Sequence, residues 1–363
     1  MAGPAAAAVP ATVTWHVHPA GRPGSVNLAG RPAAVTVAAS SRYALDYLAP
    51  TDLRAAVSAV NGRVVADVPP GAGVALAVRG WYRTGWGEWR GVPARLGAPT
   101  RRVQVRLVLS AASAGPPVVH DVVLTGTPGP AQPSPATRMQ YQVFATREGL
   151  VGRVTADGHT ITAHDHFVSL PSWSALSPRD SGDYSVRACA GGRCAYEPVW
   201  DVGPWNTHDD YWNASREQWR DLPAGTPEAQ AAFQRGYNGG RDQYGRTVLN
   251  PAGLDLADGA LWDDLRLAGN AWVSVTYLWT GGGTQAKVMT GGDPLNVRAG
   301  PGTGYPSVGL AGRYTRVPVE CQTAGQTITG PAGTSRLWDR IGPGNYVSHA
   351  YLQMNAGVTV ARC

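Results

Sequence analysis

The amino-acid sequence predicts a mostly β protein built from several domains. At 363 residues the chain exceeds the size of one ordinary domain, so two or three domains are expected. Its 46 glycines and 29 prolines indicate many turns, while a hydrophobic fraction of 43% is ample for packed cores. With only 15% charged residues, the composition favours turn-rich β domains over helical bundles or disorder.

Residues 1–127 carry the strand pattern most clearly. Apolar and polar residues alternate over short runs, for example at residues 12–17, 63–68 and 103–109, with Gly and Pro between the runs. This alternation at short spacing predicts an antiparallel β-sandwich. The proline-rich stretch 128–138 that follows predicts an extended spacer and a domain boundary.

A tryptophan-rich turn follows one strand of this block and contains Trp81, Trp86 and Trp89. Such a turn can form a sugar-stacking surface, as in carbohydrate-binding modules. Tryptophans of a sandwich belong more often to its core, so we favour the core for these three side chains.

Residues 139–281 form a second block of short strands with two helices. The first helix is expected to begin at the Thr-Pro-Glu of residues 226–228, with the threonine as cap and the proline at the first position, and to end at Gly236. The second should cover residues 258–265. A glycine-rich tether then leads to a third block, residues 285–363.

The formal charge of +6 comes almost wholly from arginine, since Lys287 is the only lysine. A positive surface can attract an anionic polymer such as an acidic wall glycan or nucleic acid. The sequence has no run of basic residues and no nucleic-acid motif, so a bias of composition explains the charge better. We expect no nucleic-acid partner and no cofactor.

The four cysteines are predicted to form two disulfides, Cys189 with Cys194 across a turn and Cys321 with the terminal Cys363. Neither pair has the ligand spacing of a metal site, so no metal is expected. Disulfides imply an oxidising compartment, and no apolar run of about 18 residues predicts a membrane span. The first residues read as the mature side of a signal cleavage site with an added initiator Met, which predicts a secreted protein.

Residues 295–306 read as a short strand that breaks into a Gly-Pro-Gly turn before Tyr305. Together with residues 338–342, 344–348 and 351–352, this stretch closely resembles the bacterial Src-homology-3-like domain. That small β-barrel often tethers secreted proteins to cell-wall peptidoglycan. The resemblance covers about the last fifth of the chain and implies a wall-binding domain at residues 285–363.

The middle block carries four further motifs in order: a T-A-x-G segment at residues 155–158, an L-P pair at 170–171, an Asp-x-Gly-Pro strand end at 201–204 and an L-D-L segment at 254–256. Their order resembles the double-psi β-barrel of the rare lipoprotein A and expansin group, interrupted by an insertion from about 206 to 246. Members of that group bind glycan chains, and some are lytic transglycosylases on peptidoglycan. The resemblance implies a double-psi β-barrel over residues 139–281.

Asp201 is the expected catalytic acid, because it matches the aspartate of the group's Asp-x-Gly-Pro strand end. Cleaving a glycosidic bond needs a protonated carboxylic acid near neutral pH. Trp200 and Trp205 flank it, where they would desolvate the carboxyl and offer ring faces to a sugar. The alternative is that Asp201 merely caps a turn.

The sequence departs from the group's pattern at its histidines. His159 stands where catalytically active relatives usually carry a glutamate, and His166 lies one residue before the position of the expected histidine. Both are included as candidate catalytic residues. His159, His164 and His166 could also gather as metal ligands, but solvated loop histidines are the better interpretation. These departures favour glycan binding without cleavage, while Asp201 between its tryptophans favours cleavage.

The insertion is dense in polar and aromatic groups, which makes four of its side chains candidate substrate contacts: Asp209, Asp210, Tyr211 and Trp212. Hydrolysis through two carboxylates would need a second acid, and Asp209 or Asp210 could supply it. A surface loop ordered by its aromatic side chains is the interpretation we prefer. Asp255 is expected to be structural, with Arg246 as a possible partner.

The sequence therefore predicts a secreted protein that engages peptidoglycan, and Asp201 makes cleavage of glycan strands, as a lytic transglycosylase or glycoside hydrolase, the sharper hypothesis. Two other functions stay open. In the first, an expansin-like barrel grips or loosens the wall without breaking a bond. In the second, the barrel binds a protein partner and only the last domain touches the wall. The oligomeric state does not follow from the sequence.

Overall fold

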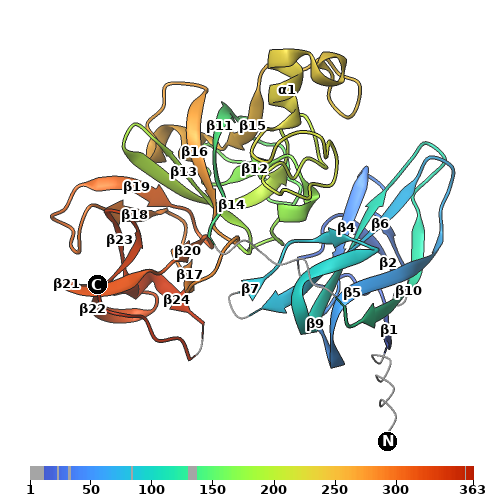
Figure 1. The fold of residues 1–363 in the computed structure, drawn as a ribbon, viewed down its shortest axis with the longest axis horizontal. Coiled ribbons are helices and arrows are strands. Elements are labelled where there is room, and N and C mark those ends of the chain that lie inside the picture. Colours follow the sequence, from blue (N-terminus) through green and yellow to red (C-terminus); the bar gives the residue numbers. More distant parts are fainter. Residues whose placement is uncertain (1–11, 23, 32–33, 83–84, 130–136, 356) are drawn as a thin grey trace, which may run out of the picture. The chain divides into compact units, whose positions relative to one another are not determined.

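A computed structural model describes residues 12–22, 24–31, 34–82, 85–129, 137–355 and 357–363. Strands make up 49% of the protein and helices 7%, which confirms a mostly β fold. The chain divides into two compact units, residues 1–134 and 135–363 (Figure 1). The first residues of the chain and most of the expected spacer at 128–138 lie outside the described residues.

The first unit is an antiparallel sheet with the order β2-β3-β10-β5-β9-β6-β7, in which β1 pairs with β10, β4 with β9 and β8 with β6. Its strands are β1 (Val13–Val17), β2 (Leu28–Arg31), β3 (Ala34–Val37), β4 (Tyr43–Tyr47), β5 (Thr51–Asp67), β6 (Gly73–Tyr82), β7 (Gly85–Trp86), β8 (Arg90–Gly91), β9 (Ala94–Ser110) and β10 (Val118–Thr127).

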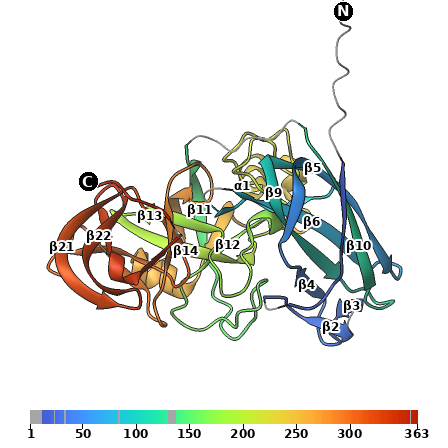
Figure 2. The same cartoon turned by 90° about the horizontal axis from the view of Figure 1, so that it is seen from below.

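Two long strands organise this unit. The first half of β5 pairs with β9, and its second half pairs with β10. The second half of β9 pairs with β6 and β4 (Figure 2). By sharing these strands, the sheet folds around one apolar core that includes Val57, Val103, Leu107 and Leu124.

In the tryptophan-rich turn of the first unit, arginine guanidinium groups lie against two of the three tryptophan rings. The guanidinium carbon of Arg79 lies 4.7 Å from the ring centre of Trp86 and 4.3 Å from that of Trp89. Arg106 lies 4.6 Å from the Trp89 ring, and Trp89 is only 2% exposed. Trp89 is therefore a core side chain, as expected, while Trp81 and Trp86 are half-buried and meet edge to face.

The first part of the second unit is built from six strands and four short helices. They are β11 (Gln140–Arg147), β12 (Val168–Leu170), η1 (Trp173–Ala175), β13 (Ser185–Ala190), β14 (Arg193–Val202), α1 (Glu228–Arg235), η2 (Tyr237–Gly240), β15 (Ala252–Leu256), η3 (Ala260–Asp264) and β16 (Ala271–Tyr277).

These six strands close into a barrel. Their order is β12-β15-β11-β16-β13-β14, and β12 pairs back onto β14. The pairs β11–β15 and β12–β14 are parallel, and the remaining neighbours are antiparallel. Closure leaves no free edge in the ring and brings residues from distant parts of the sequence onto neighbouring strands.

Helix α1 follows the prediction at its end and departs from it at its start. Gly236 adopts the left-handed conformation, with φ of 66°, and ends the helix as expected. Pro227 is the capping residue and provides no side-chain hydrogen bond. The backbone N–H of Glu228 instead donates to Asp209 Oδ2 at 2.7 Å, so a distant carboxylate replaces the predicted threonine cap. The second expected helix forms as the π-turn η3.

In the last part of the chain, one group of strands continues the barrel sheet through the parallel pair β14–β19 in the order β19-β18-β23-β22-β21, and β20-β17-β24 form a separate three-stranded sheet. Its elements are β17 (Gln285–Val288), β18 (Leu295–Arg298), β19 (Ser307–Ala311), β20 (Arg316–Pro318), β21 (Cys321–Gly330), β22 (Gly333–Gly342), β23 (Asn345–Ser348), η4 (His349–Tyr351) and β24 (Leu352–Met354).

Both predicted disulfides are confirmed. Cys189 and Cys194 face each other in the β13–β14 hairpin, and their bond closes it across Gly191 and Gly192. Cys363 bonds to Cys321 at the start of β21 and so fixes the chain end to a strand. Among the described residues, no helix is long and apolar enough to cross a membrane. These features are compatible with a secreted protein.

Candidate functional site

A row of polar side chains crosses four neighbouring strands of the barrel. Ser169 on β12 lies directly beside Asp201 on β14 and beside Asp255 on β15. Asp255 in turn lies beside Thr146 on β11. Because directly paired residues point to the same face of a sheet, these four side chains share one face. Strand spacing places the Asp201 and Asp255 backbones about 10 Å apart.

Glu148 completes the row from the end of β11. The Ser169 hydroxyl donates to Glu148 Oε2 at 2.5 Å, which places the glutamate carboxyl over the strand between the two aspartates. The Thr146 hydroxyl donates to Asp255 Oδ1. Asp201 Oδ1 accepts from its neighbour Val202 N at 2.8 Å and from Ala156 N, in the T-A-x-G loop, at 2.7 Å. Three carboxyl groups, Glu148, Asp201 and Asp255, therefore meet on one face.

These carboxyl groups hold protons more tightly than acids in water. Burial raises the pKa of Asp201 to about 7, with a further rise from the Glu148 charge and a lowering from the two N–H donors. Burial raises the pKa of Asp255 well above its usual range, and the charges of Glu148 and Asp201 add to the rise. Burial also raises the pKa of Glu148, against the Ser169 hydrogen bond. The three groups together retain at least one proton at neutral pH.

The T-A-x-G loop holds a fourth acid beside this row. Asp157 is 1% exposed and accepts from the Thr155 hydroxyl and from the His159 backbone N–H. Burial raises its pKa to about 6, and these bonds lower it in part. Because Ala156 N reaches Asp201, the loop both supports the catalytic candidate and brings a further negative charge near it.

The two histidine candidates each pair with an acid of their own. His159 Nε2 lies 2.7 Å from Asp165 Oδ2, and that hydrogen bond raises the pKa of the imidazole against its burial. His166 Nδ1 lies 3.0 Å from Asp264 Oδ1. His164, the third member of the metal set considered from the sequence, is exposed and pairs with Asp263. The structure therefore does not gather the three histidines around one point.

The tryptophans next to Asp201 differ in what they can offer a sugar. Trp200 is 9% exposed, stacks on Phe167 with ring centres 5.8 Å apart, and donates its indole N–H to Ser181 O. It is a packing residue, which corrects its prediction as a sugar platform. Trp205 is half-buried and donates to Asn250 Oδ1 at 3.0 Å, with Arg246 5.8 Å from its ring centre. Trp205 keeps part of its ring accessible.

The four substrate contacts expected in the insertion are buried, so those predictions are corrected. Tyr211 and Trp212 are fully buried, and Trp212 stacks on Tyr277 with ring centres 5.1 Å apart. Asp209 is fully buried and forms an ion pair with Arg216. Asp210 is 4% exposed and accepts from the Asn213 amide. The two acids hold other residues of the insertion, and neither carboxyl group is exposed.

Glu148 and Asp255 are the site residues that sequence reasoning missed. Asp255 was expected to be structural with Arg246 as partner, but Arg246 pairs with Asp242 at 2.5 Å. The L-D-L motif at 254–256 was the available signal, because it puts an acid on a strand between two apolar residues. Glu148 lies in none of the four motifs of the middle block. Its relation to the aspartates follows from Ser169 on β12, which bonds to Glu148 and pairs with both Asp201 and Asp255.

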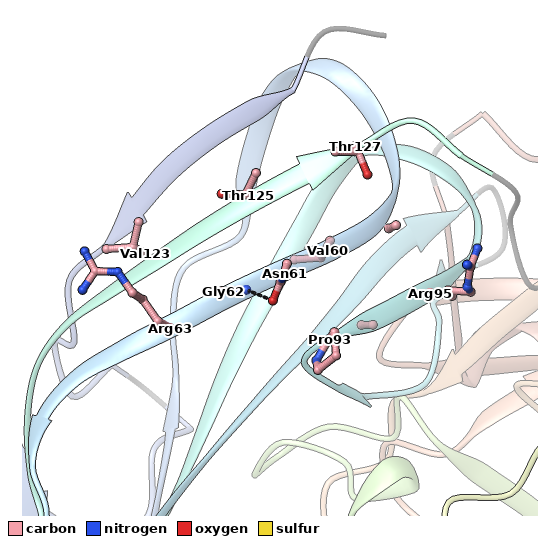
Figure 3. A pocket seen from close by; sticks show the side chains of 11 residues that line it. Val60, Asn61, Gly62, Arg63, Pro93, Arg95, Val123, Thr125 and Thr127 are labelled. Carbon is pink, nitrogen blue, oxygen red and sulfur yellow. Dashed lines mark hydrogen bonds between the residues drawn. The ribbon is translucent and has the colours of Figure 1, made fainter. Parts of the chain in front are cut away.

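Two further hollows lie away from the carboxyl row. One, of 520 Å³, lies in the last part of the chain and is lined by Leu295, Asn296, Arg298, Trp338, Ser348 and Tyr351, among others. The rest of its lining is Thr303, Ile328 and the segment 290–294. The other, of 740 Å³, lies on the first unit between β5, β9 and β10 (Figure 3). Its lining includes Asn61, Arg63 and Arg95 but no aromatic residue on which a sugar ring could stack.

Comparison with known proteins gives a family without an established activity. Residues 139–276 match a family model described as a domain of unknown function, DUF8814, and this range runs from just before β11 to the end region of β16. The chain is 37% identical over 82 residues to the uncharacterized protein YraI of Bacillus subtilis, covering 20% of this chain and 68% of that relative. The chain belongs to the YraI family.

A second relative is the uncharacterized protein YraJ of the same organism, which is 48% identical over 50 residues. That match covers 14% of this chain and 42% of YraJ, so the chain spans less than half the length of this relative. No solved structure matches the chain. These relatives are uncharacterized and indicate no activity. The carboxyl row is the feature of this chain that bears on its chemistry.

Proposed function

We propose that this protein is a secreted, peptidoglycan-engaging protein whose barrel cleaves glycan strands as a lytic transglycosylase. The observation that carries the proposal is the row formed by Glu148, Asp201 and Asp255, which shares one face of the barrel and retains a proton at neutral pH. A protonated carboxyl group beside ionisable neighbours is what acid-catalysed cleavage of a glycosidic bond requires.

In the proposed reaction Asp201 donates its proton to the leaving glycosidic oxygen. Its neighbours Glu148 and Asp255 stabilise the positive charge that develops on the sugar ring, to the extent that they are ionised. A hydroxyl of the same sugar then attacks the ring carbon, and Asp201 takes up the proton released. This route needs no second carboxylate to activate water, which fits the burial of Asp209 and Asp210, the two candidates for that role.

The resemblance of residues 285–363 to the Src-homology-3-like domain supports attachment to the wall. The hollow of 520 Å³ is lined in part by residues that carry this resemblance, and the half-buried Tyr351 contributes aromatic surface to it. Two disulfides suit an extracellular location, where the protein would meet the peptidoglycan of the cell wall. In this proposal the last domain holds the wall while the barrel works on the glycan strand.

An expansin-like role without bond cleavage is the second candidate, and one observation favours it. Catalytically active members of the rare lipoprotein A and expansin group usually carry a glutamate where His159 stands. Here His159 forms a hydrogen bond with Asp165. In that case the carboxyl row binds glycan hydroxyl groups, and wall polymers loosen without being cut.

The deciding experiment incubates purified peptidoglycan with the wild type, Asp201→Asn, Asp255→Asn and Glu148→Gln, followed by mass spectrometry of the soluble fragments. Anhydro-muropeptides from the wild type, lost in Asp201→Asn, would support the transglycosylase. Reducing-end muropeptides would replace it with hydrolysis. Wall binding by all four proteins with no fragment released would replace it with the expansin-like role.

A further inference from the structure

A second cluster of ionisable groups lies apart from the carboxyl row and inside the second unit. It consists of His166, Glu197 on β14 and Asp264 on η3, whose ligand atoms all lie within 4.8 Å of one another. Glu197 and Asp264 are fully buried, and the His166 side chain is 12% exposed. The geometry points to a site for one divalent metal ion, held by His166 Nδ1 and by the carboxylates of Glu197 and Asp264.

The polar atoms of this cluster lack hydrogen-bond partners. Five buried atoms, His166 Nδ1, both carboxylate oxygens of Glu197 and both of Asp264, make no hydrogen bond within the described residues. A buried carboxylate without a partner is costly, because burial removes its hydration and nothing replaces it. Two such groups aimed at one point, with an imidazole nitrogen beside them, are explained by a cation between them.

The distances and donor types also suit a metal ion. His166 Nδ1 and Asp264 Oδ1 lie 3.0 Å apart but lack the angles of a hydrogen bond. Ligand atoms around a tetrahedral zinc ion are separated by about 3.4 Å, since each lies about 2.1 Å from the metal. One imidazole and two carboxylates are ligands used by Zn²⁺ and Mn²⁺, and a divalent ion would cancel the two negative charges.

The site would join the barrel to the last part of the chain. The Gly312 N–H donates to Tyr196 O, next to Glu197, and a Cβ at Gly312 would collide with Glu197 Oε2. Arg193, on the same strand as Glu197, donates to Asp264 O and to Ser307 O. A metal ion here would therefore fix β14, η3 and the segment after β19 together, and its expected role is structural.

The test uses the full chain with both disulfides formed, stripped with a chelator and then titrated with Zn²⁺ and, separately, Mn²⁺. We expect saturation at one ion per chain, measured by calorimetry and elemental analysis, and a higher melting temperature with the ion than without it. Failure of both ions to bind at one per chain would overturn the site. In that case the two acids share a proton, and stability responds to pH but not to the chelator.

Variants locate the ion. Glu197→Gln and Asp264→Asn should weaken binding by about 100-fold or more and abolish the metal-dependent rise in melting temperature. Asp263→Asn is the matched control, because Asp263 is the adjacent acid of η3, its side chain is 39% exposed, and it pairs with His164. Unchanged affinity in Glu197→Gln and Asp264→Asn would overturn the assignment. If either buried variant does not fold, His166→Gln, at the exposed edge of the cluster, provides the same comparison.

Discussion

Asp201 and Glu197 lie four residues apart on β14, and burial raises the pKa of both. Their surroundings differ in one respect that decides their chemistry. Asp201 Oδ1 accepts two backbone N–H bonds and its side chain is part-exposed, whereas Glu197 is fully buried and neither of its oxygens has a hydrogen-bond partner. A raised pKa alone therefore does not identify a catalytic acid.

The difference follows from what each strand position faces. At Asp201, β12 and β15 contribute Ser169 and Asp255, and the T-A-x-G loop contributes the Ala156 N–H. The Asp201 carboxyl therefore has a hydrogen-bond donor and other acids around it, and the residue is half-buried. At Glu197 the neighbours are Asp264 and His166, with Gly312 closing the space. The first arrangement can deliver a proton to a substrate, and the second can hold a cation.

Replacing one carboxyl group by an amide at each site should give the largest difference between the catalytic role of Asp201 and the metal-binding role of Asp264. Asp201→Asn should lower the rate of muropeptide release by about 10²- to 10⁴-fold, because the amide cannot donate the proton. Asp264→Asn should leave that rate within about twofold at a temperature at which it is folded. The rates are measured by chromatography of soluble fragments over time. Equal losses in the two variants would mean that the buried cluster belongs to the reaction.

Removing the metal ion should affect stability and spare the carboxyl row. A ligand present at about 100 times its dissociation constant stabilises the folded state by about 2.7 kcal/mol, or roughly 5–10 °C in melting temperature for a unit of this size. A chelator should therefore lower the melting temperature of the wild type and leave that of Glu197→Gln unchanged. Calorimetry in the presence and absence of chelator measures both. A chelator effect on Glu197→Gln would place the ion elsewhere.

The pH dependence of stability should carry the signature of Asp201. Its folded pKa of about 7 lies above the ordinary aspartate value of 3.8, so the folded state binds the extra proton and loses stability as the pH rises from about 4 to about 7. Asp201→Asn lacks this loss and should be more stable than the wild type by on the order of 1–3 kcal/mol at pH 8, with no difference at pH 3.5. Urea unfolding at both pH values measures the difference. A difference independent of pH would show that Asp201 has the same pKa in the folded and unfolded states.

The sequence predicted more of the fold than of the site, for a physical reason. Period-two alternation and cysteine pairing are local or pairwise signals, and both the β content and the disulfides Cys189–Cys194 and Cys321–Cys363 are confirmed. Burial is not local. Tyr211 and Trp212 looked like surface aromatics because their polar neighbours Asp209 and Asp210 suggested a loop, yet Arg216 neutralises Asp209 inside the core.

Glu148 and Asp255 were missed because a closed barrel sets their relation to Asp201. The three residues are 53 and 54 positions apart along the chain, and only the pairing of β12 between β14 and β15 makes them neighbours. The Asp201 position itself was available from a motif, since an acid at a strand end before Gly-Pro is a local pattern. His159 and His166 were singled out by motif position, while their partners Asp165 and Asp264 became visible only in the folded chain.

The smallest expected effect comes from Ser169→Ala, which removes the hydroxyl donor to Glu148. That bond favours the ionised carboxylate and lowers the pKa of Glu148, so its loss raises this pKa. The negative charge of Glu148 raises the pKa of Asp201, so a Glu148 that is protonated more of the time leaves the pKa of Asp201 lower. The rate of muropeptide release should then fall at a higher pH on the acid side, where Glu148 becomes protonated, and at a lower pH on the basic side, where Asp201 loses its proton. Each limb should move by about half a pH unit, because one hydrogen bond contributes about 1 kcal/mol.

Ser172→Ala is the control for this change, because Ser172 is a fully buried serine whose hydroxyl bonds to Ser174 and not to an acid of the row. A profile shifted as a whole, rather than narrowed, would mean that Glu148 and Asp201 titrate independently. The row would then be three separate acids rather than one coupled group. Because Glu197 has no hydroxyl donor to remove, the same substitution has no counterpart at the buried cluster, which is the chemical difference between these two positions on β14.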